Sequence, residues 1–136
     1  MRVERAALAE VDSHAVEGSP NEVCGLLIGP RGGGRVTQAR RARNTVTERA
    51  RDRYEIDPRD HIRSQKECDA AGLEVVGYYH SHPDHPAQPS VFDAERAWAG
   101  PLYLIVSVAR GKVAGRNAFV AERDGGPFQP EPLQVR

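Results

Sequence analysis

The run VCGLLIG at 23–29 constrains the fold of this chain more than any other feature. It is almost continuously apolar, and Glu22 and Pro30 bound it on the two sides. A short apolar run between such boundaries is typical of a strand that is buried on both faces of a sheet. The rest of the chain must therefore supply cover for both faces.

Three segments are expected to form helices that supply this cover. Apolar residues recur close to helical spacing over 4–17. The segment 57–71 opens with Asp-Pro and is followed by Gly72, which are start and stop signals, and Ile62 is expected on its inner face. The sequence SVFDAERAWAG at 90–100 predicts the third helix.

Further strands alternate with these helices, and the strands at 102–109 and 112–122 are expected to form a hairpin through the turn residues Arg110 and Gly111. Helices interleaved with strands predict an α/β fold, a mixed sheet with helices on its faces. At 136 residues, with no repeat and no linker, residues 1–136 are expected to form a single domain. The predicted further strands are 35–42, 53–58, 73–82, 102–109, 112–122 and 131–136.

Composition excludes several classes of function. The net charge is zero, which gives no global attraction to nucleic acid or to an anionic membrane. Seven arginines fall between 35 and 53, and we interpret them as solvated faces in preference to a docking surface for an acidic protein. The sequence shows no signal peptide and no apolar run of about 18 residues, so a cytoplasmic location is expected. Two cysteines without a CxxC pattern predict no disulfide framework.

The stretch GYYHSHPDHPAQPSVFD at 77–93 concentrates histidines, prolines and carboxylates. Residues i and i+2 of a strand share a face, so His80 and His82 are expected to project together. Ser90 begins the following helix and returns Asp93 towards the strand end, where the helix dipole favours an ionised carboxylate. Ser90 and Asp93 also resemble an N-terminal capping arrangement, and both descriptions can hold at once.

Two histidines and one carboxylate could be three ligands of one metal ion. They would leave the fourth tetrahedral position for water, as in catalytic zinc sites. The alternative is a proline-stiffened surface loop that happens to contain histidines. A catalytic site also needs a general base, and the HExxH pattern that supplies one in many metalloproteases is absent. Spacing alone does not identify the base.

A larger pattern resolves this choice. NEVCGLLIG, YEIDP, GYYHSHPDHPAQPSVFD and LYLIVSV occur in this order over about residues 1–120. Together they resemble the JAMM zinc metallopeptidases, the catalytic MPN-plus domains, in their compact standalone prokaryotic form. The resemblance matches an early glutamate, then His-Ser-His, seven residues of which the first is Pro83, and Ser-x-x-Asp without a gap.

The resemblance implies an MPN-type mixed sheet, similar in layout to cytidine deaminases, and one Zn²⁺ per chain. His80, His82 and Asp93 would hold the zinc, Glu22 would be the general base, and Ser90 would donate a hydrogen bond to the developing oxyanion. The implied reaction is hydrolysis of peptide or isopeptide bonds at the C-terminal Gly-Gly tail of a ubiquitin-like or sulfur-carrier protein. Neither nucleic acid nor a membrane is an expected partner.

Two alternatives remain at this point. A non-catalytic MPN scaffold that binds protein partners would need none of the five motif residues, so their presence argues against it. The other alternative is a cysteine hydrolase based on Cys24, whose activity would survive removal of metal by a chelator. We interpret Cys24 instead as a small buried residue that fills apolar space. His85 is expected to be a solvent-facing loop residue, and Tyr78, Tyr79 and Trp98 are expected to be packing residues.

Overall fold

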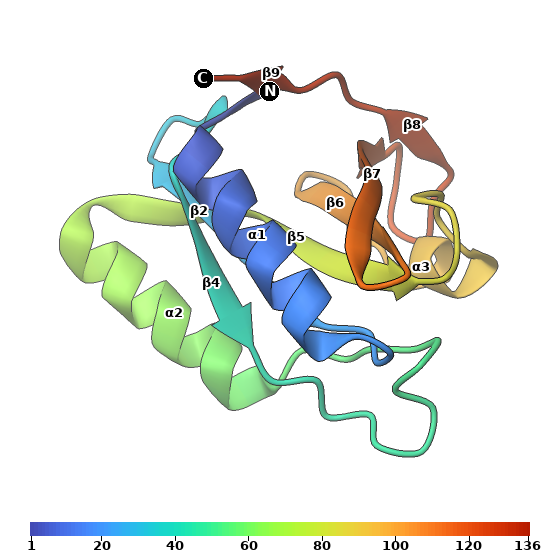
Figure 1. Cartoon of the computed structure of the whole chain (residues 1–136). Helices are drawn as coiled ribbons and strands as arrows, with labels where there is room; N and C mark the ends of the chain where they lie inside the picture. The colour runs from blue at the N-terminus through green and yellow to red at the C-terminus, as the bar shows by residue number, and fades with distance from the viewer.

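The computed structural model describes residues 1–136 and is built on a six-stranded mixed sheet (Figure 1). The strand order is β4-β2-β5-β6-β7-β8. β5 and β6 are parallel, and every other neighbouring pair is antiparallel. The predicted α/β mixed sheet is therefore confirmed. Its strands are β2 (Cys24–Pro30), β4 (Gln38–Ala42), β5 (Leu73–Pro83), β6 (Leu102–Ala109), β7 (Lys112–Ala121) and β8 (Phe128–Pro130).

A second, three-stranded sheet joins the two ends of the chain. β1 (Arg2–Val3) pairs in parallel with β3 (Arg35–Val36) on one side and with β9 (Gln134–Val135) on the other. The two termini consequently lie side by side (Figure 1). The single strand predicted at 35–42 is divided, with β3 in this sheet and β4 in the larger one.

The two long helices cover opposite faces of the larger sheet. Leu27 of β2 shares a buried cluster with Val11 of α1 (Arg5–Gly18), whereas Leu26 shares one with Cys68 of α2 (Pro58–Ala71). Successive strand residues point to opposite faces, so α1 and α2 lie on different sides. The two-sided burial predicted for this strand is confirmed. None of the helices combines the length and the apolar character needed to cross a membrane.

The boundaries of α2 follow the predicted signals, but its orientation does not. Asp57 caps the helix by accepting a hydrogen bond from the Arg59 amide at 2.9 Å, and Gly72 ends it with a φ of 71°. The prediction that Ile62 faces inward is wrong, because its side chain is 51% exposed. The buried face of α2 carries Ser64 and Cys68, which lie one helical turn apart.

The strand predicted at 53–58 is also wrong. Only an isolated bridge between Asn44 and Ile56 forms there. The Asn44 side chain bonds the carbonyl of Arg53 and the amide of Glu55, so these backbone groups have a side-chain partner in place of a neighbouring strand. A side chain that satisfies backbone groups in this way competes with a sheet ladder.

The third helix is shorter than predicted. α3 spans Val91–Glu95, not 90–100. Beyond it, the Trp98 amide donates to the Tyr103 hydroxyl at 2.8 Å. A tertiary partner thus takes the place of the next intrahelical bond, and the chain turns towards β6.

A substitution at Gly77 of β5 tests the close contact between β5 and β6. A Cβ atom there would lie 2.1 Å from the carbonyl oxygen of Leu102 on β6, and rigid backbone would have to move. We expect Gly77→Ala to lower the free energy of unfolding by about 1–3 kcal/mol, the usual cost of overpacking. Gly115→Ala on β7 is the control, since a Cβ there meets no atom within 4 Å. Equal stability of the two variants in urea unfolding would contradict this account of the β5–β6 contact.

Candidate active site

The C-terminal half of β5 carries the two histidines of the HSH motif. His80 and His82 project from the same side of the strand, and their Nε2 atoms are 3.1 Å apart. Both side chains are buried. His82 Nδ1 lies 2.9 Å from the carbonyl oxygen of Pro86, a contact that fixes the orientation of its ring. The expected convergence of the two imidazoles is therefore present.

Asp93 joins the histidines from the first turn of α3. Its Oδ2 atom lies 3.3 Å from His80 Nε2 and 3.2 Å from His82 Nε2. The Ser90 amide donates to the same oxygen at 2.9 Å, and the Ser90 hydroxyl oxygen accepts from the Asp93 amide at 3.0 Å. The capping arrangement is thus complete on both sides, and it aims the carboxylate at the histidines.

Glu22 approaches the same point from the segment that enters β2. Cys24 pairs with His80 across the antiparallel β2–β5 ladder, and this register places Glu22 opposite His82. The Ser81 hydroxyl accepts a hydrogen bond from the Val23 amide at 2.9 Å, which fastens the segment to β5. Ligand atoms of Glu22 and the two histidines lie within 4.8 Å of one another.

The carboxylate of Glu22 is buried and incompletely bonded. Glu22 is only 5% exposed, and its Oε1 atom has no hydrogen-bond partner. Burial raises the pKa of Glu22 to about 8. A buried acid with a free oxygen and such a pKa can take up a proton near neutral pH.

Asp93 differs from Glu22 in its electrostatics. Burial alone would raise its pKa, but hydrogen bonds to His80 and His82 hold the pKa well below the usual range. Burial lowers the pKa of His80. For His82, burial acts in the same direction, yet hydrogen bonds with Asp93 and the Pro86 carbonyl raise its pKa overall. Asp93 is therefore the permanently ionised carboxylate of the pair.

These side chains fit a zinc ion. The three atoms His80 Nε2, His82 Nε2 and Asp93 Oδ2 are 3.1, 3.2 and 3.3 Å apart. Ligand atoms about 2.0–2.1 Å from a tetrahedral zinc ion are separated by about 3.3–3.4 Å. Two imidazole nitrogens and one carboxylate oxygen also form a donor set that zinc accepts, with one position left open.

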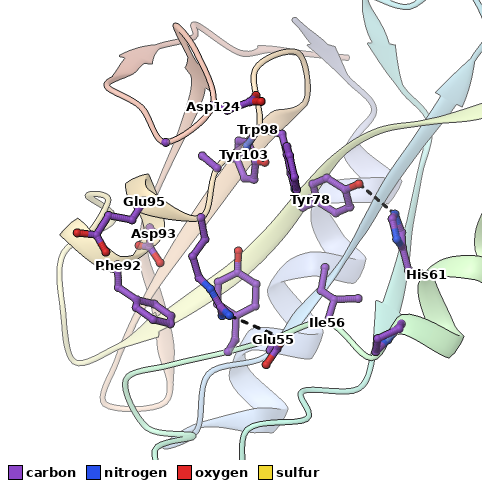
Figure 2. Close-up of a pocket in the computed structure, with 15 residues that line it drawn as sticks. Glu55, Ile56, His61, Tyr78, Phe92, Asp93, Glu95, Trp98, Tyr103 and Asp124 are labelled. Carbon is purple, nitrogen blue, oxygen red and sulfur yellow. Dashed lines mark hydrogen bonds and ion pairs between the residues drawn. The ribbon is translucent and has the colours of Figure 1, made fainter.

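A cleft of about 700 Å³ opens beside Asp93. Both aromatic and charged residues line it, and Figure 2 shows Trp98, Tyr78 and Tyr103 gathered on one side of it. The expected packing role of Trp98 is wrong, because its side chain is 63% exposed at the cleft. Tyr78 is partly buried and also lines the cleft, whereas Tyr79 is fully buried as expected.

Cys24 and His85, which lie near the motif in the sequence, are outside the site. Cys24 belongs to the buried cluster beside α2, and burial raises the pKa of its thiol to about 12. A thiol that stays protonated is a poor nucleophile, so the structure argues against a cysteine hydrolase. His85 is exposed in the loop after β5, as expected.

The structure adds two residues that the sequence patterns did not single out. Tyr54 stacks on His80, with ring centroids 4.3 Å apart and planes inclined by 20°. Asn44 bonds the Glu22 carbonyl through Nδ2 at 3.1 Å. Tyr54 belongs to the YEIDP segment, but its contact with His80 is a tertiary one that sequence spacing does not reveal.

Comparisons with known proteins bear on this geometry. Prokaryotic homologs of the JAB domain match residues 4–121. A desampylase of Haloferax volcanii is 43% identical over 70% of this chain and 71% of its own length. A probable TtuB-protein conjugate cleaving protease of Thermus thermophilus is 33% identical over 75% of this chain and 67% of its own. A CysO-cysteine peptidase of Mycobacterium tuberculosis is 33% identical over 70% and 64%.

The fold has a matching solved structure. A JAB1/MPN domain protein of Archaeoglobus fulgidus superposes with a TM-score of 0.65 at 19% identity, covering 100% of this chain and 97% of that one. The sheet, its flanking helices and the buried histidine–carboxylate cluster define an MPN-type α/β domain with a candidate metal centre. The chain belongs to the family of prokaryotic homologs of the JAB domain. The resemblance to compact prokaryotic JAMM proteins is thereby confirmed.

The geometry predicts which residues a metal ion needs. We expect His80→Ala and Asp93→Ala to lose bound zinc while they keep the fold, because each removes one of three donor atoms and the core does not depend on them. His85→Ala is the matched control and should bind zinc as the wild type does, since this histidine is exposed in the loop. Metal analysis of the three purified proteins measures this. Full zinc content in both ligand variants would rule out the assignment.

Proposed function

We propose that the chain is a zinc-dependent hydrolase of the JAMM type that cleaves peptide or isopeptide bonds at the C-terminal Gly-Gly tail of a ubiquitin-like or sulfur-carrier protein. The observation that carries this proposal is the buried triangle of His80 Nε2, His82 Nε2 and Asp93 Oδ2 beside the unpartnered carboxylate of Glu22. A structural site would not require a second, uncommitted carboxylate at the same point.

In this proposal His80, His82 and Asp93 hold one zinc ion per chain. Bound zinc would lower the pKa of a water molecule to about 7 and polarise the scissile carbonyl. The Pro86 carbonyl keeps Nδ1 of His82 protonated, so the Nε2 lone pair is free to bind the ion. Asp93 contributes negative charge, and the hydrogen bond that it accepts from the Ser90 amide favours its ionised form.

Glu22 acts as the general base. The positive charge of a bound zinc ion would favour the ionised carboxylate, whose free Oε1 atom accepts the proton of the attacking water. Burial favours the protonated form, which holds that proton after the transfer. The same group then returns the proton to the leaving amine. One side chain thus serves both proton transfers, first from the water and then to the amine.

Ser90 stabilises the developing oxyanion. Its hydroxyl oxygen accepts the helix-capping bond from the Asp93 amide, and a hydroxyl that accepts one bond still has its hydrogen to donate. The residue is exposed, so a substrate oxygen can reach it. A donor fixed in place before the reaction is well suited to oxyanion stabilisation.

A Gly-Gly tail suits this site for a steric reason. The side chains of the proposed zinc ligands are buried, so the scissile bond must approach closely. Glycine lacks Cβ and lets backbone approach where other residues cannot. The names of three relatives also support this class of substrate, since they denote desampylase, TtuB-protein conjugate cleaving and CysO-cysteine peptidase activities.

Glu22→Gln tests the reaction itself. We expect the zinc-loaded variant to lose on the order of 10²–10⁴-fold in kcat, because an amide cannot accept the proton. The assay follows release of a reporter fused to the Gly-Gly end of a small carrier, with zinc content measured in the same samples. Chelation should stop wild-type cleavage and added zinc should restore it. Near-normal turnover of Glu22→Gln would place the base elsewhere.

Ser90 variants separate capping from catalysis. Glycine caps a helix nearly as well as serine, whereas alanine costs about 0.5–2 kcal/mol. In metal-free protein, Ser90→Ala should therefore be less stable than Ser90→Gly. Neither residue can donate a side-chain hydrogen bond, so both zinc-loaded variants should lose about 10²–10³-fold in kcat. Wild-type kcat in Ser90→Gly would eliminate the oxyanion role and leave only the cap.

A further inference from the structure

Asn44 is the hydrogen-bonding centre of the segment between β4 and α2. Its Nδ2 group donates to the carbonyl oxygens of Glu22 and Arg53, each at 3.1 Å. Its Oδ1 atom accepts from the amides of Val46 and Glu55, each at 3.0 Å. An asparagine amide has two donor hydrogens and an oxygen with two lone pairs, so every site of this side chain is occupied.

Two of these four bonds hold the backbone around Tyr54. Arg53 and Glu55 are its two chain neighbours, so Asn44 holds the backbone on both sides of this residue. The Tyr54 ring lies against the His80 ring at 4.3 Å with nearly parallel planes. Asn44 therefore links the backbone of Glu22 to the ring that covers His80.

His80 depends on this stacking more than His82 does. The ring of His82 is anchored at Nδ1 by the Pro86 carbonyl. The polar contacts of His80 run through Nε2, to His82 Nε2 and to Asp93 Oδ2. Rotation of the His80 ring is consequently restrained by the face of Tyr54, which takes the part that an outer hydrogen bond plays for most metal-binding histidines.

The neighbours of Tyr54 secure the segment to α3. The Arg53 guanidinium lies 4.4 Å from the ring centroid of Phe92, which precedes Asp93 in the chain. Glu55 forms an ion pair with Arg96 at 3.8 Å, drawn as a dashed line in Figure 2. The residues on both sides of Tyr54 thus contact α3 or the residue that ends it, while Tyr54 itself contacts His80.

We propose that Asn44 and Tyr54 are positioning residues of the metal site. Tyr54 sets the plane of the His80 ring, and Asn44 holds Tyr54 and the backbone of Glu22 in one fixed relation. This inference rests on the proposed function, in which His80 binds zinc and Glu22 is the base. It predicts weaker zinc binding when Tyr54 loses its ring, and lower turnover of the zinc-loaded protein when Asn44 loses its donor groups.

The test of Tyr54 compares two substitutions. Tyr54→Leu removes the flat ring but keeps apolar bulk, and we expect its zinc Kd to rise by about 10–100-fold, the usual effect of losing an outer support. Tyr54→Phe retains the ring and should restore the wild-type Kd. Competition with a chromophoric chelator measures both values, and urea unfolding of the metal-free proteins shows that each is folded. Equal zinc affinity in Tyr54→Leu and wild type would overturn the role of Tyr54.

The test of Asn44 uses an isosteric change. Asn44→Asp keeps both acceptor sites but loses the donors to the Glu22 and Arg53 carbonyls. We expect kcat on the Gly-Gly fusion to fall by up to about 10²-fold with KM unchanged, because the base is displaced while substrate binding is not. Asn21→Ala, an exposed change beside Glu22, is the control and should behave as wild type. Wild-type kcat in Asn44→Asp would overturn the role of Asn44.

His80→Ala distinguishes failure of this inference from failure of the proposed function. If His80→Ala loses zinc and Tyr54→Leu binds it normally, the positioning role is wrong and the ligand assignment stands. If His80→Ala binds zinc as the wild type does, His80 is not a ligand, and the ligand assignment and the positioning role fall together.

Discussion

The site depends on the register of β5 between its two neighbours in the sheet. β5 pairs with β2 so that His80 lies opposite Cys24, and with β6 so that His82 lies opposite Ser107. A slip of one residue on either side would turn both histidines to the other face of the sheet. Ser81, which lies between the two histidines, secures this register, because its amide and its hydroxyl both bond the backbone of Val23. The motif therefore works only in a strand that is paired on both edges.

Burial then separates the tasks of the two carboxylates. Asp93 receives hydrogen bonds from its own capping arrangement and from the histidines, and it stays ionised. Glu22 enters the same pocket with one oxygen unpartnered, and burial raises its pKa. Environments that drive two acids apart in pKa are the usual basis for different roles in one active site. The segment carrying Asn44 and Tyr54 supports both sides of this arrangement, since it contacts the backbone of Glu22 and the ring of His80.

Local signals in the sequence predicted most of the scaffold. The capping residues of α2, the apolar run of β2 and the alternation that pairs His80 with His82 each act within a few residues, so spacing reveals them. The predictions of secondary structure failed where a side chain distant in the sequence bonds the backbone. In the segment 53–58, the side chain of Asn44, about ten residues earlier, bonds the Arg53 carbonyl and the Glu55 amide, and only an isolated bridge forms in place of a strand. Glu22 could be selected only by family resemblance, since its distance from β5 in the chain hides their contact.

A zinc-edge anomalous scattering map of crystals of the zinc-loaded chain tests the central claim most directly, which is that two nearby carboxylates have different tasks. The account predicts one ion bound by His80 Nε2, His82 Nε2 and an Asp93 oxygen at about 2.0–2.2 Å, with Glu22 beyond bonding distance. An ion ligated by Glu22 in place of Asp93 would contradict it.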